Sequence, residues 1–293
     1  MGAMTHTRRN HLWRGGSPSG SRPDLGPALG TWFNCNLETG EILSLSLAEC
    51  DGGLILRAFG ADDPAPCDWG QTSAIPHVSG PGSREVGGFT ARYDFGFMEA
   101  QIAANLKYGV LVIQSYHTFK DGSERPAYFT REFFHQDLGR EDPAARRAGA
   151  GAPAIPCRMA GDLPPEAGGS SPGTVDLAPL LGRWRNTYRN SKGIHRVALA
   201  REGDRFMLRG WGIGCDEDWG RVPVVPHAIN VASRRPAGFL ARYDFGFSEL
   251  SLAANESQGL LIIASYSTFR DGSGRPSYFT REFFYREGDS LSS

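Results

Sequence analysis

A long internal repeat constrains this chain more than any other feature. Gly88 to Phe134 aligns without a gap on Gly238 to Phe284, and about 32 of the 47 aligned residues are identical. Upstream the similarity is weaker, but Leu29 to Trp32 still matches Leu181 to Trp184. Such self-similarity predicts that the chain contains two copies of one folding unit.

The repeat divides the 293 residues into four predicted segments. We expect a disordered N-terminal segment at 1–28, a first unit at 29–137, a linker at 138–180 and a second unit at 181–288. The linker contains no aromatic residue, and about half of it is Ala, Gly and Pro, so it has too little apolar surface to offset the entropy lost on ordering.

Charge and hydropathy exclude several classes of partner. The net charge is −1, which gives no general attraction to nucleic acid or to an anionic membrane. No apolar run approaches the length of a membrane span, and the N-terminus lacks the apolar core of a secretory signal. We therefore expect a cytoplasmic protein that contacts neither nucleic acid nor membrane.

The five cysteines form no CxxC pair, so neither a zinc site nor a disulfide framework is indicated and we expect isolated reduced thiols. The sequence also lacks a nucleophile elbow, a phosphate-binding loop, a dinucleotide fingerprint and an HExxH motif. We therefore expect no cofactor and no metal.

The two units carry opposite charge. Residues 29–137 contain 7 Lys and Arg against 14 Asp and Glu, whereas residues 181–288 contain 16 against 11. Drift between duplicates accounts for this difference, and docking of the units on one another, steered by charge, is the alternative.

Within each unit the apolar pattern has a period of two and is interrupted by Gly, Pro and Asp, which indicates β-strands. Eight strands are predicted in the first unit, and the second repeats them at the same spacing. We expect an all-β fold of two tandem eight-stranded up-and-down antiparallel β-barrels, because closure removes exposed strand edges. A β-sandwich is the main alternative. The predicted strands are 30–36, 42–48, 53–60, 68–75, 88–95, 97–104, 109–119 and 127–135.

A short motif in each unit resembles the signature of the calycins, the family of lipocalin-like and avidin-like barrels. Gly30-x-Trp32 opens the first strand and Arg131 lies in the last, and the second unit has Gly182-x-Trp184 with Arg281. The resemblance implies that each tryptophan closes one end of a barrel and that the arginine packs across its ring.

Paired acidic residues are the candidates for acid–base chemistry. Arg92 and Asp94 share one face of a strand, and Phe89, Ala91 and Tyr93 share the other. We expect the aromatic face to point inward, which makes Arg92 and Asp94 structural surface residues; with the faces reversed, they become a buried acid and its cationic partner. The candidate catalytic residues are Asp94, Glu132, Asp244 and Glu282.

Aromatic residues and histidines that recur in both units are the candidates for ligand contacts. A tyrosine presents an apolar ring with one hydrogen-bonding tip, which suits an apolar ligand that carries a carbonyl group. Each of these side chains could equally serve only in packing. The candidates are Trp69, His77, Tyr93, Tyr116, Tyr128, Trp219, His227, Tyr243, Tyr266 and Tyr278.

Three functions are compatible with these features. The first is binding of a small, largely apolar molecule within or between the units. The second is a cofactor-independent cyclase, isomerase or lyase of natural-product metabolism, in which Tyr, Asp or Glu polarises a carbonyl group. The third is carbohydrate binding at two sites. Because the first halves of the units have diverged, we expect their pockets to differ.

Overall fold

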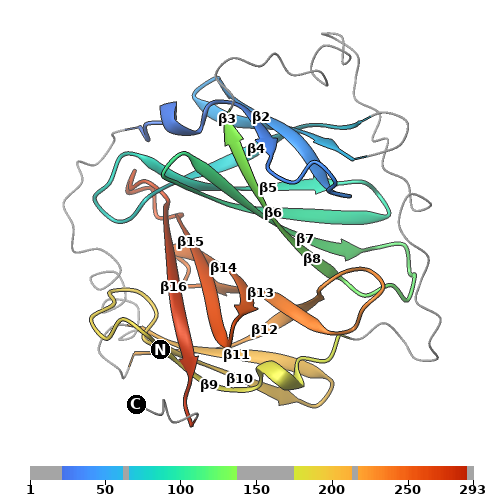
Figure 1. Ribbon diagram of the computed structural model, residues 1–293. Helices are drawn as coiled ribbons and strands as arrows, with labels where there is room; N and C mark the ends of the chain where they lie inside the picture. The colour runs from blue at the N-terminus through green and yellow to red at the C-terminus, as the bar shows by residue number, and fades with distance from the viewer. Residues whose placement is uncertain (1–21, 62–65, 137–174, 213–216, 289–293) are drawn as a thin grey trace.

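The computed structural model describes residues 22–61, 66–136, 175–212 and 217–288, and the fold they form is all-β (Figure 1). The first repeat contains β1 (Gly30–Asn34), β2 (Ile42–Cys50), β3 (Gly53–Gly60), β4 (Cys67–Val78), β5 (Val86–Asp94), β6 (Met98–Lys107), β7 (Val110–Phe119) and β8 (Tyr128–Gln136). The second contains β9 (Gly182–Asn186), β10 (Arg196–Glu202), β11 (Arg205–Trp211), β12 (Asp218–Ala228), β13 (Pro236–Asp244), β14 (Ser248–Ser257), β15 (Leu260–Phe269) and β16 (Tyr278–Arg286).

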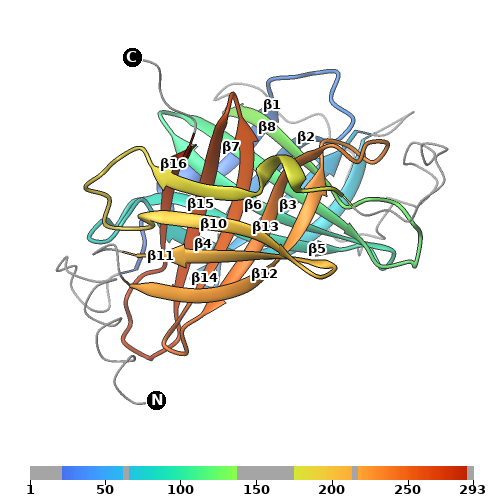
Figure 2. The ribbon, with the colours of Figure 1, turned by 90° about the horizontal axis from the view of Figure 1, so that it is seen from below.

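Strand pairing follows the chain order within each repeat. Each strand pairs antiparallel with the next one, β1 also pairs with β8, and β9 also pairs with β16. Two single parallel bridges, Val78 with Tyr278 and Tyr128 with Ala228, join the repeats into one 16-stranded sheet. Figure 1 shows the first repeat in blue to green above the second in yellow to red, and Figure 2 shows the same arrangement from below.

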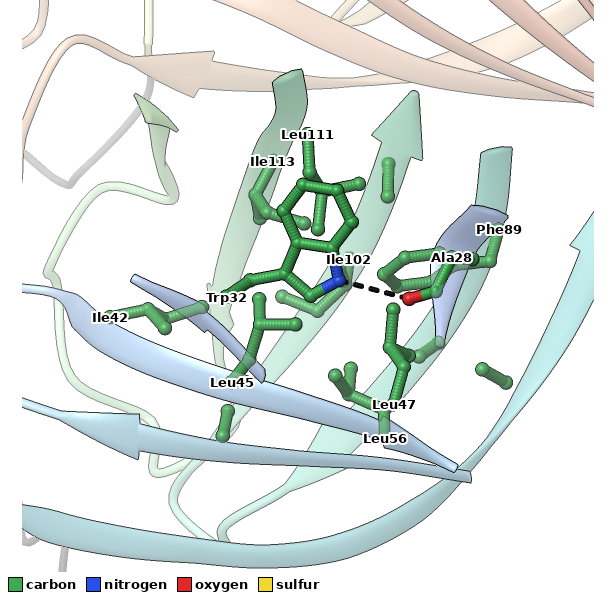
Figure 3. Close-up of a cluster of buried hydrophobic side chains, with 14 of the residues drawn as sticks. Ala28, Trp32, Ile42, Leu45, Leu47, Leu56, Phe89, Ile102, Leu111 and Ile113 are labelled. Atoms are coloured by element: carbon green, nitrogen blue, oxygen red, sulfur yellow. Dashed lines mark hydrogen bonds between the residues drawn. The ribbon is translucent and has the colours of Figure 1, made fainter. Parts of the chain in front are cut away.

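The core of each repeat is built around one tryptophan. Trp32 is 1 % exposed, and its indole N–H donates to the carbonyl oxygen of Ala28 at 2.9 Å (Figure 3). Trp184 makes the equivalent bond to Leu180 at 2.9 Å. A buried indole needs such a partner, because an unsatisfied N–H costs free energy. The short 3-10 helices that supply these carbonyls are η1 (Gly26–Ala28) and η3 (Ala178–Leu180).

These helices lie outside the predicted units. The predicted disordered segment at 1–28 and linker at 138–180 both extend into the fold, because Ala28 and Leu180 are buried in the two cores. Their helices are too short to show a periodic pattern in the sequence. The rest of both segments, 1–21 and 138–174, lies outside the described residues.

The orientation of the β5 side chains confirms the prediction that the aromatic face points inward. Phe89, Ala91 and Tyr93 are buried in the first core, whereas Arg92 and Asp94 are exposed. The period of two in the sequence is therefore sufficient to assign the faces of this strand.

The packing of arginine on the tryptophan differs from what the calycin resemblance implies. Arg286 lies over the Trp184 ring, with 4.8 Å from the guanidinium carbon to the ring centroid. Arg281 lies instead over Phe283 at 5.5 Å, and Arg131 over Phe133 at 5.2 Å. The reason is strand alternation: Arg131 and Arg281 point to the opposite face from the buried Phe134 and Phe284 that accompany the tryptophans in the cores. In the first repeat the Arg286 position is Gln136, whose side-chain amide donates to the carbonyl oxygen of Leu29 at 2.8 Å.

The prediction of isolated reduced thiols is wrong for Cys67, which is disulfide-bonded. The spacing of cysteines along a sequence does not show which of them meet in space. Cys35 and Cys50 are exposed thiols that form no disulfide.

Candidate functional site

Asp94 and Asp244 lie on the surface, at the ends of β5 and β13. Asp94 pairs with Lys120 and accepts a hydrogen bond from the Gly96 backbone N–H at 2.9 Å. The Lys120 ammonium lowers the pKa of Asp94. Asp244 makes the equivalent contacts with Arg270 at 3.5 Å and with the Gly246 N–H at 2.7 Å. These contacts fix two turns.

Glu132 and Glu282 tie the last strand of each repeat to the start of its second strand. The Glu132 carboxylate accepts bonds from Asn34 Nδ2 at 2.8 Å, from Thr39 Oγ1 and from the Ile42 backbone N–H at 3.3 Å. Burial raises the pKa of Glu132, although these donors oppose the shift. Glu282 has the same environment, made by Asn186, Ser191 and Ile194, and burial raises its pKa too.

Trp69 and Tyr93 belong to the core of the first repeat. Their rings meet edge to face with 5.5 Å between centroids, and the Tyr93 hydroxyl lies 3.3 Å from the Leu56 carbonyl oxygen and 3.2 Å from that of Gly70. Trp219 and Tyr243 meet in the same way at 5.6 Å in the second repeat. Burial raises the pKa of both tyrosines, so the hydroxyls stay protonated as donors.

His77, Tyr116, His227 and Tyr266 lie where the repeats meet, and they make reciprocal contacts. The His77 ring packs on Tyr266 at 5.1 Å, and the His227 ring packs on Tyr116 at 5.0 Å. The Tyr116 hydroxyl donates to the Ala254 carbonyl oxygen at 3.3 Å, and the Tyr266 hydroxyl donates to that of Ala104 at 3.0 Å. Each contact recurs when both residues are exchanged for their equivalents in the other repeat, 150 positions away. The repeats are therefore related by a pseudo-two-fold axis.

Tyr128 and Tyr278 have chemically different neighbours in the two repeats. Tyr128 stacks on His117 with 4.3 Å between ring centroids, and His117 Nε2 lies 3.5 Å from the Glu41 carboxylate. His117 is fully buried. The second repeat has Ser267 and Gly193 at the positions of His117 and Glu41, so this cluster occurs in the first repeat alone.

A groove opens between the repeats, on the pseudo-two-fold axis. Its volume is about 520 Å³, and the residues that line it come in equivalent pairs from β4 to β6 and from β12 to β14. Three pairs define its character: Ile75 with Val225, Arg92 with Arg242, and Glu99 with Glu249. We call this the interrepeat groove.

Apolar and charged groups have separate places in the interrepeat groove. Ile75 and Val225 are 49 % and 46 % exposed, which is high for aliphatic side chains on central strands. Arg92 pairs with Glu99, and Arg242 pairs with Glu249 at 2.5 Å. The groove thus offers apolar contact surface together with two sets of hydrogen-bonding groups that are charged but balanced.

The structure does not bring the predicted site residues together in one pocket. They lie in the two cores, at the contact between the repeats and in surface turns, and none of them lines the interrepeat groove. Sequence reasoning missed Ile75 and Val225 as candidates. The available signal was that each is an aliphatic residue repeated before a Pro-His pair.

Within the described residues, no group of three or more His, Cys, Asp or Glu side chains could hold a metal ion. No helix in this part of the chain is long and apolar enough to cross a membrane. No protein-family model matches the sequence, and no curated protein matches it either.

Proposed function

We propose that the chain is a calycin-like double β-barrel that binds a small, largely apolar molecule in the interrepeat groove. Closure of each repeat as a barrel is supported by the pairing of β1 with β8 and of β9 with β16, since the eight strands then leave no unpaired edge. NMR tests this closure directly: cross-strand contacts between the backbones of Phe33 and His135 are expected, and an open sandwich would lack them.

The observation that carries the binding proposal is the position of Ile75 and Val225. Both are half exposed at the groove, where water contacts apolar surface that a ligand would cover. The volume of about 520 Å³ falls in the range of small-molecule sites. The repeat interiors are less suitable, because large aliphatic and aromatic side chains fill both cores, as Figure 3 shows for the first repeat.

The Arg92-Glu99 and Arg242-Glu249 pairs can orient a ligand in the interrepeat groove. A ligand with a carbonyl or hydroxyl group at one end can exchange hydrogen bonds with Arg92 or Arg242 while its apolar body contacts Ile75 and Val225. Because each arginine already has a carboxylate partner, the groove does not require an anionic ligand.

Fluorescence titration with anilinonaphthalene sulfonate tests the proposal. We expect one bound probe per chain, and at least a tenfold loss of affinity when Ile75 and Val225 are both replaced by serine. The control is Tyr108→Ser, which removes a 92 % exposed aromatic ring from a distant turn. Equal affinity of the double variant and the control variant would contradict the groove as the binding site.

A cofactor-independent acid–base enzyme is the second candidate, and the contact of His117 with Glu41 favours it. Imidazole, carboxylate and phenol groups lie together in the first repeat, and such a set can transfer protons. An active site must admit its substrate, so diethyl pyrocarbonate should label His117 in the native protein at a rate near that of the exposed His135. Complete protection of His117 would exclude the enzyme.

The carbohydrate-binding alternative and the cytoplasmic location stay predictions.

A further inference from the structure

A second hollow, of about 240 Å³, lies on the outer face of β9 to β12, within the second repeat. Four arginines line it, namely Arg183, Arg196, Arg209 and Arg221, together with the ring of Trp211. It shares no lining residue with the interrepeat groove.

The sheet register places three of these arginines in one row. Arg183 lies opposite Ala198, Ala198 opposite Arg209, and Arg209 opposite Arg221. Directly opposed side chains on neighbouring strands are about 5 Å apart at Cβ. The small side chain of Ala198 therefore leaves a gap in the row, between the guanidinium groups of Arg183 and Arg209.

The same row in the first repeat contains one arginine. Its residues are Thr31, Ser46, Arg57 and Gln71, paired in the same register. Arg57 bonds to Asp68, just as Arg209 bonds to Asp218. That single ion pair is therefore the structural element that both repeats share, and Arg183 and Arg221 are additions in the second repeat.

The added charges exceed the acids beside them. Arg209 is matched by Asp218, and Arg221 reaches Glu202 at 2.6 Å. Arg183 has no ion-pair partner among the described residues, and Arg196 lies over the Trp211 ring at 4.4 Å. Like charges directly opposite on neighbouring strands are destabilising, and the first repeat has the uncharged Gln71 opposite Arg57 where the second has Arg221 opposite Arg209.

We propose that this hollow binds a phosphate group, held between Arg183 and Arg209 above the gap at Ala198, with Arg221 beside Arg209 as a further positive charge. Guanidinium groups donate two parallel hydrogen bonds to phosphate oxygens. The phosphate can be free or can belong to a phosphomonoester, and in the second case Trp211 and Met207 offer apolar contact to the organic part.

Isothermal titration of the full chain at low ionic strength distinguishes these sources. The probes are inorganic phosphate, phenyl phosphate and phenol. Binding of both phosphates but not of phenol is the expected result, and tighter binding of phenyl phosphate assigns the site to a phosphomonoester. Equal affinity assigns it to phosphate alone, and failure of both phosphates to bind would overturn the proposal.

The first repeat supplies the variants for this test. The double substitution Arg183→Thr and Arg221→Gln installs the residues that the first repeat has at these positions. We expect at least a tenfold loss of phosphate affinity with an unchanged melting temperature in the absence of phosphate. Arg189→Gln, in an exposed loop of the same repeat, removes one positive charge outside the hollow and should keep the affinity within twofold. An equal loss in both variants would reduce the effect to general charge and refute a defined site.

Discussion

His77 and His227 are almost completely excluded from water where the repeats meet, and burial lowers the pKa of each to about 3. In the unfolded chain a histidine titrates near 6.5. The unfolded state therefore binds more protons than the folded state between these two values, so the stabilising effect is complete above pH 6.5 and is lost as the pH falls towards 3.

We expect the free energy of unfolding to decrease below pH 6.5, by up to about 1.4 kcal/mol per pH unit for each of the two histidines. Urea unfolding between pH 4.5 and pH 7.5 measures this slope. His77→Gln or His227→Gln should each remove about half of the histidine contribution.

Glu132 and Glu282 have the opposite effect on the pH dependence of stability. Their pKa values are raised by burial, so the folded state keeps their protons longer and stability decreases as the pH rises above the usual glutamate range. The histidine effect must therefore be taken as the difference between variant and parent protein at each pH. A parent slope that persists unchanged in both histidine variants would contradict the assignment.

Single residues also show how far sequence reasoning reaches. The inward position of Tyr93 and the outward position of Asp94 follow from alternation along one strand, which is a local property. The roles of Tyr116 and His227 could not be predicted, because their partners lie in the other repeat and nothing in a strand pattern shows which outer face another domain covers. For the same reason Ile75 and Val225 resemble ordinary strand residues in the sequence.

At the scale of the strand, two glycines let neighbouring strands support the contact between the repeats. A Cβ atom on Gly238 would lie 2.1 Å from the Ala254 carbonyl oxygen on β14, and one on Gly88 would lie 2.3 Å from that of Ala104 on β6. These two oxygens accept the hydroxyl bonds of Tyr116 and Tyr266 from the opposite repeat. The glycines are therefore needed both for strand pairing and for the contact across the pseudo-two-fold axis.

Gly238→Ala is expected to destabilise the protein by on the order of 2 to 4 kcal/mol, because backbone atoms must move to admit the methyl group. Chemical denaturation measures the loss. Gly40→Ala is the matched control, since a Cβ atom there meets nothing within 4 Å. If Gly238→Ala also breaks the hydroxyl bond, Tyr116→Phe should cost less in its presence than alone, and strictly additive effects would argue against that coupling.

Most of the element boundaries could be predicted from the sequence, since β2, β3 and β7 begin within a residue of their predicted starts. The larger differences are in β4 and β6, which run on to Val78 and Lys107. The extension of β4 ends at the parallel bridge from Val78 to Tyr278, where the Val78 N–H donates to the Ser277 carbonyl oxygen at 2.8 Å. A hydrogen bond to the other repeat leaves no pattern in the sequence around Val78.

At the scale of the whole molecule, the two repeats share a small apolar cluster besides their separate cores. It contains Ala103, Tyr116 and Phe129 from the first repeat and Ala253, Ala264 and Tyr266 from the second. Unfolding of one repeat would expose half of this cluster, so we expect calorimetry to show a single cooperative transition for the chain.

Ala253→Glu should separate that transition into two, because it places an unpaired charge in a position that is 2 % exposed. The control is Ala232→Glu, at an exposed loop position, which should keep one transition. Two transitions already present in the parent protein would show that the repeats unfold independently.

If the two walls of the interrepeat groove were identical, an asymmetric ligand would bind with the same affinity in either of two opposite orientations. Besides Ile75 and Val225, which are both aliphatic, the walls differ at three equivalent pairs: Ser73 with Pro223, Thr90 with Leu240, and Gln101 with Ser251. In two of these pairs the wall from the first repeat has a hydroxyl group, and the wall from the second repeat has an apolar side chain. Because both walls belong to one chain, residues of one wall could be substituted without the same substitution in the other. A bound molecule is therefore expected to take one orientation, with its more polar edge towards the first repeat.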